Sequence, residues 1–423
     1  MSPDGNATTD GRRSSAHRTA ETVWRMESAA VVAVASRVVG DVGIGEEIAQ
    51  DAFVAALEQW PADGVPPNPA GWLVTTARHK ALDLVRRRST YARKLAEVGR
   101  SIDQEAGEDV DALLDDHIGD DLLRLVFTTC HPSLTPESRV ALTLRLLGGL
   151  RTDEVARGLL ISEATAAQRV SRAKRTLARE GVGVELPAAD AMPERLASVL
   201  DVLYLVFNEG YVATSGDDWT RSELCHEAIR LARVLCALLP DEASVHAFDA
   251  LLELQASRLP GRVSAAGAPV PLLEQDRRLW DRLLIRRGTA ALERAHQLGG
   301  ARGPYALQAA ISLCHATAPV AADTDWPLIA GLYAQLDAVS PSPVVSLNRA
   351  VALGMAGSPS DGLALLEGVE GLADYPMRRA ARGQLLEQLG RTAEAVDEFR
   401  AAAELTRNAG ERELLRRRAD ALL

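Results

Sequence analysis

The segment 162–177, SEATAAQRVSRAKRTL, limits what this chain can fold into more than any other stretch does. Ser162 is of a residue type that begins helices well, because its hydroxyl can accept a hydrogen bond from a free backbone N–H group. Apolar side chains follow at helical spacing, at positions 166, 170, 173 and 177 (Ala166, Val170, Ala173 and Leu177). The spacing predicts one helix that buries a narrow stripe against its own domain.

A second stripe of the same helix is polar and mostly cationic. It contains Thr165, Gln168, Arg169, Arg172, Arg175 and Arg179. Arginine pairs with guanine edges and glutamine with adenine edges in the DNA major groove, so this composition favours a recognition helix. Upstream, Thr152 begins a short stretch that fits the first helix of a helix-turn-helix. An ordinary exposed helix with solvated arginines is the alternative for the segment taken alone.

Composition favours an all-α protein of two or three domains. The chain has 423 residues, is rich in alanine, leucine, arginine and glutamate, and contains only 4% aromatic residues. Its net charge is −11, which excludes a uniformly basic nucleic-acid coat. The cations are grouped instead, in residues 78–94 and 169–179.

We expect no metal site, no cofactor site and no active site. The four cysteines lack CxxC spacing, and we expect buried thiols in a reducing cytoplasm; they are Cys130, Cys225, Cys236 and Cys314. Glu209 and the histidines at 226, 246, 296 and 315 have no ligand or nucleophile–base spacing, so an enzyme is disfavoured. No apolar run has membrane-spanning length and no signal-peptide core is present, which predicts a cytoplasmic protein.

Breaks in the pattern divide the chain into six segments. We expect a disordered tail (1–19), a helical domain (20–95), an acidic linker (96–121), a helix-turn-helix domain (122–181), a short linker (182–193) and a helical C-terminal domain (194–423). Residues 97–121 contain ten acidic residues and one arginine, which is typical of a solvated connector.

The end of the chain contains an internal repeat. Segments 349–366 and 382–399 align at an offset of 33 residues, which is close to the period of tetratricopeptide helix pairs. In this alignment Arg349 matches Arg382, Gly357 matches Gly390, and Leu366 matches Phe399. The repeat is clearest in 340–423, and a chance similarity of Ala/Leu-rich helices is the alternative.

A second cationic helix is predicted over Trp72–Arg88, after a break rich in proline and glycine (61–71). Residues 78–94 have a net charge of +6, so they would neutralise phosphates without reading sequence. Trp72, beside hydroxyl groups, could stack on an unpaired base. A basic helix end that favours the helix dipole is the alternative.

Three motifs in this order resemble the sigma-70 superfamily, and specifically the small extracytoplasmic-function (ECF) sigma factors. They are DAFVAALEQW (51–60), WLVTTARHKALDLVRRR (72–88) and residues 134–177. The resemblance covers about 24–180 and implies that the first domain is sigma region 2, which binds core RNA polymerase and the −10 element. The domain 122–181 would be region 4, whose helix-turn-helix binds the −35 element.

The resemblance also implies site residues. Those for polymerase binding are Glu47, Asp51, Phe53, Glu58 and Trp60. Those for −10 DNA are Trp72, Thr76, Arg78, His79, Lys80, Asp83, Arg86 and Arg87. Those for −35 DNA are Thr165, Gln168, Arg169, Arg172, Lys174 and Arg175. His79 departs from the family, which usually has asparagine there, so the −10 base preference is open.

The C-terminal domain resembles the extension of one subgroup of these factors, with tetratricopeptide-like helices. It would gate activity by packing on the other domains or by binding an unidentified protein or small-molecule regulator. Two alternatives act without core polymerase: a helical-repeat adaptor, and a ligand-sensing helix-turn-helix regulator that binds palindromic DNA as a dimer.

Overall fold

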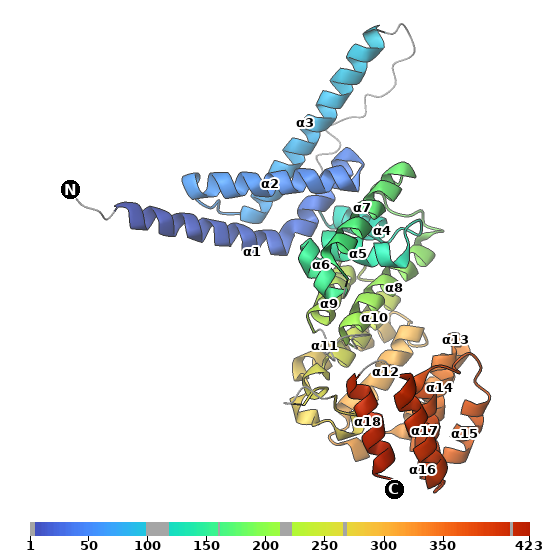
Figure 1. The fold of residues 1–423 in the computed structure, drawn as a ribbon. Helices are drawn as coiled ribbons and strands as arrows, with labels where there is room; N and C mark the ends of the chain where they lie inside the picture. Colours follow the sequence, from blue (N-terminus) through green and yellow to red (C-terminus); the bar gives the residue numbers. More distant parts are fainter. Residues whose placement is uncertain (1–4, 99–117, 160, 212–221, 265–268, 407–408) are drawn as a thin grey trace. The chain divides into compact units, whose positions relative to one another are not determined.

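The computed structural model describes residues 5–98, 118–159, 161–211, 222–264, 269–406 and 409–423 (Figure 1). Regular secondary structure in these ranges is helical, and the one β interaction is an isolated antiparallel bridge between Val263 and Pro269. The predicted all-α fold is therefore confirmed. The chain forms two compact units, residues 1–203 and 204–423.

Eight helices begin in the described residues of the first unit. They are α1 (Gly5–Val39), α2 (Val42–Asp63), α3 (Pro69–Val98), α4 (Ile118–Thr129), α5 (Pro136–Leu146), α6 (Thr152–Gly158), α7 (Glu163–Arg179) and α8 (Met192–Tyr211). Helix α8 begins inside the predicted linker (182–193) and continues across residue 203, where the two compact units divide.

Helices α1 and α2 run side by side and form the base of the first domain (Figure 1). The Asp41 carboxylate accepts a hydrogen bond from the Ile44 backbone N–H (2.9 Å), which caps α2. Gly45 permits the close approach, because a Cβ atom there would lie 2.1 Å from Ser36 Oγ and 2.5 Å from Ser36 Cα. Any larger residue at 45 would push the two helices apart.

Helix α1 begins at Gly5, inside the segment 1–19 for which a disordered tail was predicted. Polar composition suggested disorder, but the small residues Ala16 and Ala20 are buried against the rest of the domain. The His17 ring Nε2 lies 3.1 Å from the Leu57 carbonyl oxygen of α2. Contacts made far along the chain therefore stabilise a helix that its own sequence favours only weakly.

The second unit is also helical. Its α-helices, after the end of α8, are α9 (Ser222–Leu238), α10 (Ala243–Ala256), α11 (Arg282–Gln297), α12 (Pro304–Thr317), α13 (Trp326–Val339), α14 (Pro343–Met355), α15 (Pro359–Glu367), α16 (Pro376–Gln388), α17 (Thr392–Leu405) and α18 (Ala409–Asp420). Short 3₁₀ turns lie at Leu259–Gly261, Leu272–Glu274, Arg277–Leu279 and Ala321–Asp323.

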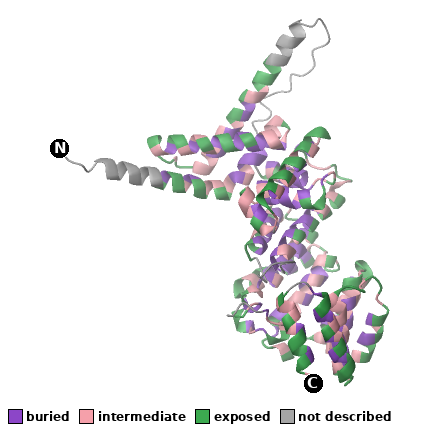
Figure 2. Cartoon of the chain, in the orientation of Figure 1, coloured by how far each residue is buried: buried purple, intermediate pink, exposed green. Residues whose placement is uncertain are grey.

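Helix α10 is the central element of the first half of this unit, with ten of its 14 residues buried (Figure 2). It contacts α9, α11 and α12. Two acids, Asp249 and Glu253, are buried on it among leucines and alanines. Arg233 of α9 donates to Glu253 at 2.8 Å. Burial, together with the nearby Glu253 carboxylate, raises the pKa of Asp249 to about 7.

This raised pKa predicts a pH-dependent stability of the second unit. A carboxyl group whose pKa is higher in the folded than in the unfolded state stabilises the fold while protonated, and this contribution is lost as pH rises from about 4 through about 7. As pH rises through that window, we expect the free energy of unfolding of the Asp249→Asn variant to increase relative to that of the wild type. Above the window the difference between the two proteins should no longer change. Urea unfolding at a series of pH values measures the difference. A difference in unfolding free energy that is the same at every pH would contradict the burial of an ionisable Asp249.

The C-terminal helices form two pairs at the predicted offset. Helices α14 and α16 both begin with proline, and each of the pairs α14–α15 and α16–α17 is joined by a turn with a glycine at positive φ, Gly357 (94°) and Gly390 (73°). Only glycine adopts this conformation at little cost. The ring of Phe399 fills the core of the second pair.

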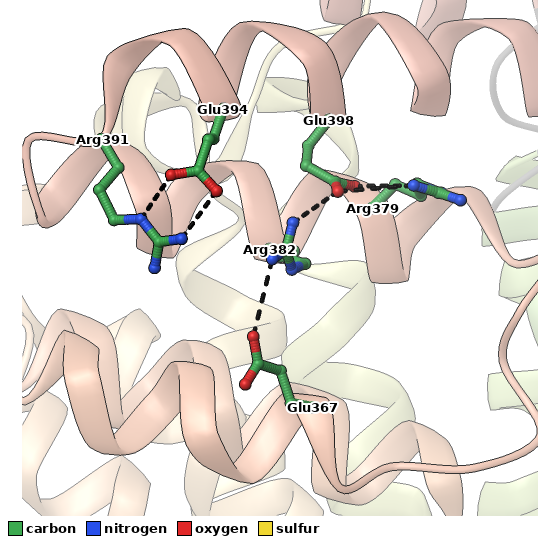
Figure 3. Close-up of polar contacts among 6 residues, drawn as sticks. All are labelled: Glu367, Arg379, Arg382, Arg391, Glu394 and Glu398. Atoms are coloured by element: carbon green, nitrogen blue, oxygen red, sulfur yellow. Dashed lines mark hydrogen bonds and ion pairs between the residues drawn. The ribbon is translucent and has the colours of Figure 1, made fainter.

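The matched arginines play equivalent roles in the two pairs. Arg349 of α14 forms an ion pair with Asp337 of α13 (3.2 Å), and Arg382 of α16 forms one with Glu367 of α15 (3.6 Å). Each therefore links its helix to the preceding one. Arg382 also contacts Glu398 of α17 (2.6 Å), as Figure 3 shows. Such half-exposed pairs add little stability.

Candidate nucleic-acid interface

Helix α7 has the cap and the buried stripe that the sequence predicts. The Ser162 hydroxyl accepts a hydrogen bond from the Thr165 backbone N–H at 3.1 Å. Ala166, Ala173 and Leu177 are at most 2% exposed, and Val170 is half-buried. This stripe packs on α5 and α6. The helix is thus held by one face, as the second helix of a helix-turn-helix must be.

The polar side of α7 carries the side chains expected to contact DNA. Gln168, Arg172 and Arg175 are exposed, and Thr165 and Arg169 are half-buried. Arg175 Nε contacts the Ser171 carbonyl oxygen at 3.4 Å, within the same helix. The exposed guanidinium groups lie on successive turns, so they can reach neighbouring base pairs or phosphates.

Lys174 is placed differently from its neighbours on α7. It is half-buried, and its ammonium group forms an ion pair with Glu46 of α2. The side chain therefore does not project into solvent in this structure, although its position in the sequence suggested a DNA contact.

Helix α3 separates its apolar and cationic faces. Leu73, Ala77 and Ala81 are 0% exposed, and α3 contacts α1 and α2. The side chains on the other side are exposed, and they are His79, Lys80, Asp83, Arg86, Arg87 and Arg88. The side chains of Arg93 and Lys94, which contribute to the predicted charge, lie outside the described residues.

The aromatic start of α3 packs against α2. The half-buried Trp72 meets Trp60 edge to face, with ring centroids 5.6 Å apart. Trp60 is only 2% exposed, so the contact between α2 and α3 rests on a buried ring. Thr76 and Arg78, which share the start of the helix, are half-buried.

The acidic residues expected to bind polymerase lie on the outer face of α2. Glu47, Asp51 and Glu58 are exposed. Phe53 is half-buried and stacks on Trp24 of α1, with centroids 4.8 Å apart. The outer face of α2 is thus acidic and rigid, since the aromatic pair holds it to α1.

Besides the Lys174–Glu46 pair, two charged contacts between the domain of α1–α3 and that of α4–α7 were missed by sequence reasoning. Arg37 of α1 pairs with Asp121 of α4 at 2.8 Å, and Asp121 is only 2% exposed. Burial raises the pKa of the Asp121 carboxyl group, and this effect outweighs the lowering by the nearby Arg37 guanidinium group. The second contact joins Glu46 of α2 to Arg145 of α5 (2.9 Å). These partners are 84 and 99 residues apart, and no local pattern links them.

The cysteines and histidines do not gather into a reactive site. All four cysteines are free thiols, with Cys130 and Cys225 buried and Cys236 and Cys314 half-buried. Burial raises the pKa of each of them, and that of Cys225 to about 12, so they stay protonated at neutral pH. Among the described residues no three His, Cys, Asp or Glu side chains are grouped as metal ligands would be.

Burial, with two nearby arginines, lowers the pKa of His315 to about 3, which makes it a neutral core residue. None of the helices in the described ranges is both long and apolar enough to cross a bilayer.

Three family models match the chain. Sigma-70 region 2 matches residues 24–91, and Sigma-70 region 4 matches residues 124–177. These matches contain nearly all of α7 and the exposed cations of α3. The third model is a family of unknown function (DUF6596), and it matches residues 195–296, which contain α9 and α10.

Several curated proteins are similar to the chain. An "Uncharacterized protein R00370" of Rhizobium meliloti is 42% identical over 381 residues, which is 90% of each chain. The "Probable ECF RNA polymerase sigma factor SigI" of Mycobacterium tuberculosis is 26% identical over 41% of this chain and 60% of its own. The "ECF RNA polymerase sigma factor SigK" of Mycobacterium ulcerans is 30% identical over 35% and 77%. No solved structure matches.

Proposed function

Because this chain belongs to the extracytoplasmic-function group of the sigma-70 superfamily, we propose that it directs core RNA polymerase to promoters through three helices of its first unit and is regulated through its second. Its sigma-70 domains support core RNA polymerase and promoter DNA as partners. A protein with these partners acts in the cytoplasm.

One observation carries this proposal: two separate cationic helices of one compact unit expose their arginines. Helix α3 presents Arg86, Arg87 and Arg88, and α7 presents Arg172 and Arg175. Two such helices fit two separated elements of one promoter better than they fit a symmetric palindrome. A dimeric repressor would leave the cations of α3 without a role.

Each helix has a distinct part in the proposed mechanism. The acidic face of α2, with Glu47, Asp51 and Glu58, docks on core polymerase. Helix α3 captures the −10 region, where unstacking of a base step costs a few kcal/mol. The side chains for this are Trp72, Thr76, Arg78, His79, Lys80, Asp83, Arg86 and Arg87. Helix α7 binds the −35 element with Thr165, Gln168, Arg169, Arg172 and Arg175, joined by Lys174 once it is free.

The second unit would gate this activity. Support comes from its own compact core and from its helix pairs at the 33-residue offset, which are typical of tetratricopeptide-like protein-binding domains. Its regulator would be a protein or a small molecule that contacts these helices.

Run-off transcription with purified core polymerase tests the function as a whole. We expect promoter-specific transcripts from fragments of the source genome only when the full chain is added. The absence of transcripts from every template, combined with failure to bind core polymerase, would instead favour a helical-repeat adaptor. Tight palindromic DNA binding without polymerase would favour the ligand-sensing regulator.

The cations of α3 predict a specific salt dependence. Replacing Arg86 and Arg87 by Gln should remove up to two phosphate contacts, which lowers the slope of log affinity against log salt by about 2. Fluorescence anisotropy of holoenzyme on labelled promoter DNA measures the slope. Arg400→Gln, at an exposed arginine of α17, is the matched control and should leave it unchanged. Equal slopes for all variants would remove α3 from the interface.

A further inference from the structure

Three arginines lie close together in the segment that connects α10 with α11 in the second unit. Arg258 and Arg277 both lie over the indole ring of Trp280, with their Cζ atoms 5.5 Å and 5.2 Å from its centroid. The Cζ atom of Arg262 lies 3.9 Å from the centroid of the Tyr211 ring. Burial lowers the pKa of Arg258, and the nearby charge of Arg262 lowers it further. Three positive charges are thus gathered where Arg262 and Arg277 are only 8% and 4% exposed.

The described carboxylates do not neutralise these charges. Neither Arg258 nor Arg277 forms an ion pair with any of them, and the carboxylate that acts on Arg277 belongs to the exposed Asp323. Tyr333, which also acts on Arg258, is neutral, because burial raises its pKa to about 12. Burial, followed by the charges of Arg258 and Arg277, lowers the pKa of His315 to about 3. The core around these arginines therefore has a positive potential.

The hydrogen bonds of Arg277 and Arg258 are very different. Arg277 donates to the backbone carbonyl oxygens of His315 (2.8 Å) and Ala318 (2.9 Å). It also donates to the Thr324 hydroxyl group (2.9 Å), so its guanidinium group is fixed. Arg258 makes no hydrogen bond with a described residue, and its Nε atom is buried without a partner among them. Buried donors are normally paired, so an unpaired one indicates a missing acceptor.

Charge decides which acceptor fits Arg258. A water molecule would accept a hydrogen bond but would leave the buried positive charges without a counter-charge, which is strongly disfavoured. A guanidinium group presents a planar fork of N–H donors that matches two oxygens of a carboxylate or phosphate group. Arg258 is half-buried and not closed off, so a small anion can reach it from solvent. An oxyanion therefore fits both the geometry and the charge.

We propose that Arg258 is the centre of an oxyanion site in the second unit, which takes a small molecule with a carboxylate or phosphate group. The fork of Arg258 binds the anionic group, and Arg262 and Arg277 supply the positive potential around it. The Trp280 and Tyr211 rings hold the cations through their faces. The inference deepens the proposed function and rests on it for the role of the ligand, since it gives the small-molecule regulator of the second unit a site and a chemical class.

The stability of the ligand-free protein separates this role from a structural one. An arginine that only supports the fold should destabilise the protein when it is replaced. An arginine whose charge is unpaired until an anion binds should not, because an apolar side chain of similar length removes that charge. We expect the thermal midpoint of the second unit in Arg258→Met, measured by calorimetry without oxyanions, to equal or exceed that of the wild type. A marked drop would make Arg258 a structural residue and would overturn the inference.

Binding is measured on the full chain, by calorimetric unfolding in rising concentrations of inorganic phosphate, succinate or adenosine monophosphate. Chloride keeps the ionic strength constant. Once an anion that binds exceeds its Kd, each further tenfold increase should raise the midpoint of the second unit by roughly 3–6 °C. A response to succinate alone would assign a carboxylate ligand, and a response to the two phosphate compounds alone would assign a phosphate ligand.

Three variants locate the bound anion. Arg258→Met should abolish the response, and Arg258→Lys, which keeps the charge but loses the fork, should weaken binding at least tenfold. Arg278→Gln is the matched control, since this exposed arginine pairs with Asp276 and should respond as the wild type does. No response of the wild type to any of the three anions, or an equal response of Arg258→Met, would overturn the inference. The measurement needs neither polymerase nor DNA, so a failure of run-off transcription would affect the proposed function alone.

Discussion

Replacement of both Arg172 and Arg175 by alanine is expected to lower the affinity of holoenzyme for the −35 element by roughly a hundredfold. Each arginine that reads a base edge contributes about 1–3 kcal/mol to discrimination. Both side chains are exposed, and their only described polar contact is that of Arg175 with the Ser171 backbone. Alanine favours the helix, so the fold should be preserved. Competition binding to promoter fragments with intact and scrambled −35 elements measures the loss.

Binding to core polymerase provides the internal control for this variant. It should be unchanged, because the polymerase-binding acids lie on α2. Arg157→Ala, at an exposed arginine of α6 that pairs with Asp153, should keep wild-type affinity for the −35 element. An equal loss of DNA binding and core binding in the double variant would mean that the domain has unfolded, and unchanged DNA binding would contradict the role of α7.

The second large effect is expected in the repeat core. Phe399 is 0% exposed, and its ring lies so close to Gly383 that a Cβ atom there would be 3.0 Å from it. Phe399→Ala leaves a cavity that the packed helices cannot fill, which costs about 3–5 kcal/mol. For a unit of this size we expect the thermal midpoint to fall by roughly 10 °C. Calorimetry should show the shift only in the transition of the second unit.

Leu405→Ala is the matched control, since this residue of α17 is 38% exposed and should shift the midpoint little. If the second unit controls transcription, promoter output of Phe399→Ala should depart from the wild type above the lowered midpoint. Output identical to the wild type at those temperatures would contradict control by this unit. A shift in the transition of the first unit would contradict the separate cores.

Local patterns predicted the helices that carry the candidate site. The alternation of apolar and cationic residues predicted both faces of α7. Ser162 predicted where the helix begins. Both signals are local, because capping and amphipathic burial depend on residues only a few positions apart. The buried face of α3 followed from the same spacing. The offset of 33 residues located the two C-terminal helix pairs, since each repeat needs the same turn and the same small contact residues.

Features that depend on distant contacts were not predictable in this way. Residues 5–19 look polar and disordered, yet α1 is stabilised by packing on α2. Glu46 looks like one more solvated acid of α2, but Arg145 and Lys174 approach it from positions 99 and 128 residues further along the chain. Asp249 lies in an apolar helix whose burial is set by α9, α11 and α12.

Footprinting of the holoenzyme on one promoter tests the central claim most directly. If two cationic helices of one chain bind one start site, hydroxyl radicals should reveal protection at both the −35 and the −10 elements. The Arg172/Arg175 variant should lose the first and keep part of the second, and the free factor should protect neither. Protection at one element alone with the wild-type holoenzyme, or complete protection by the free factor, would contradict the account.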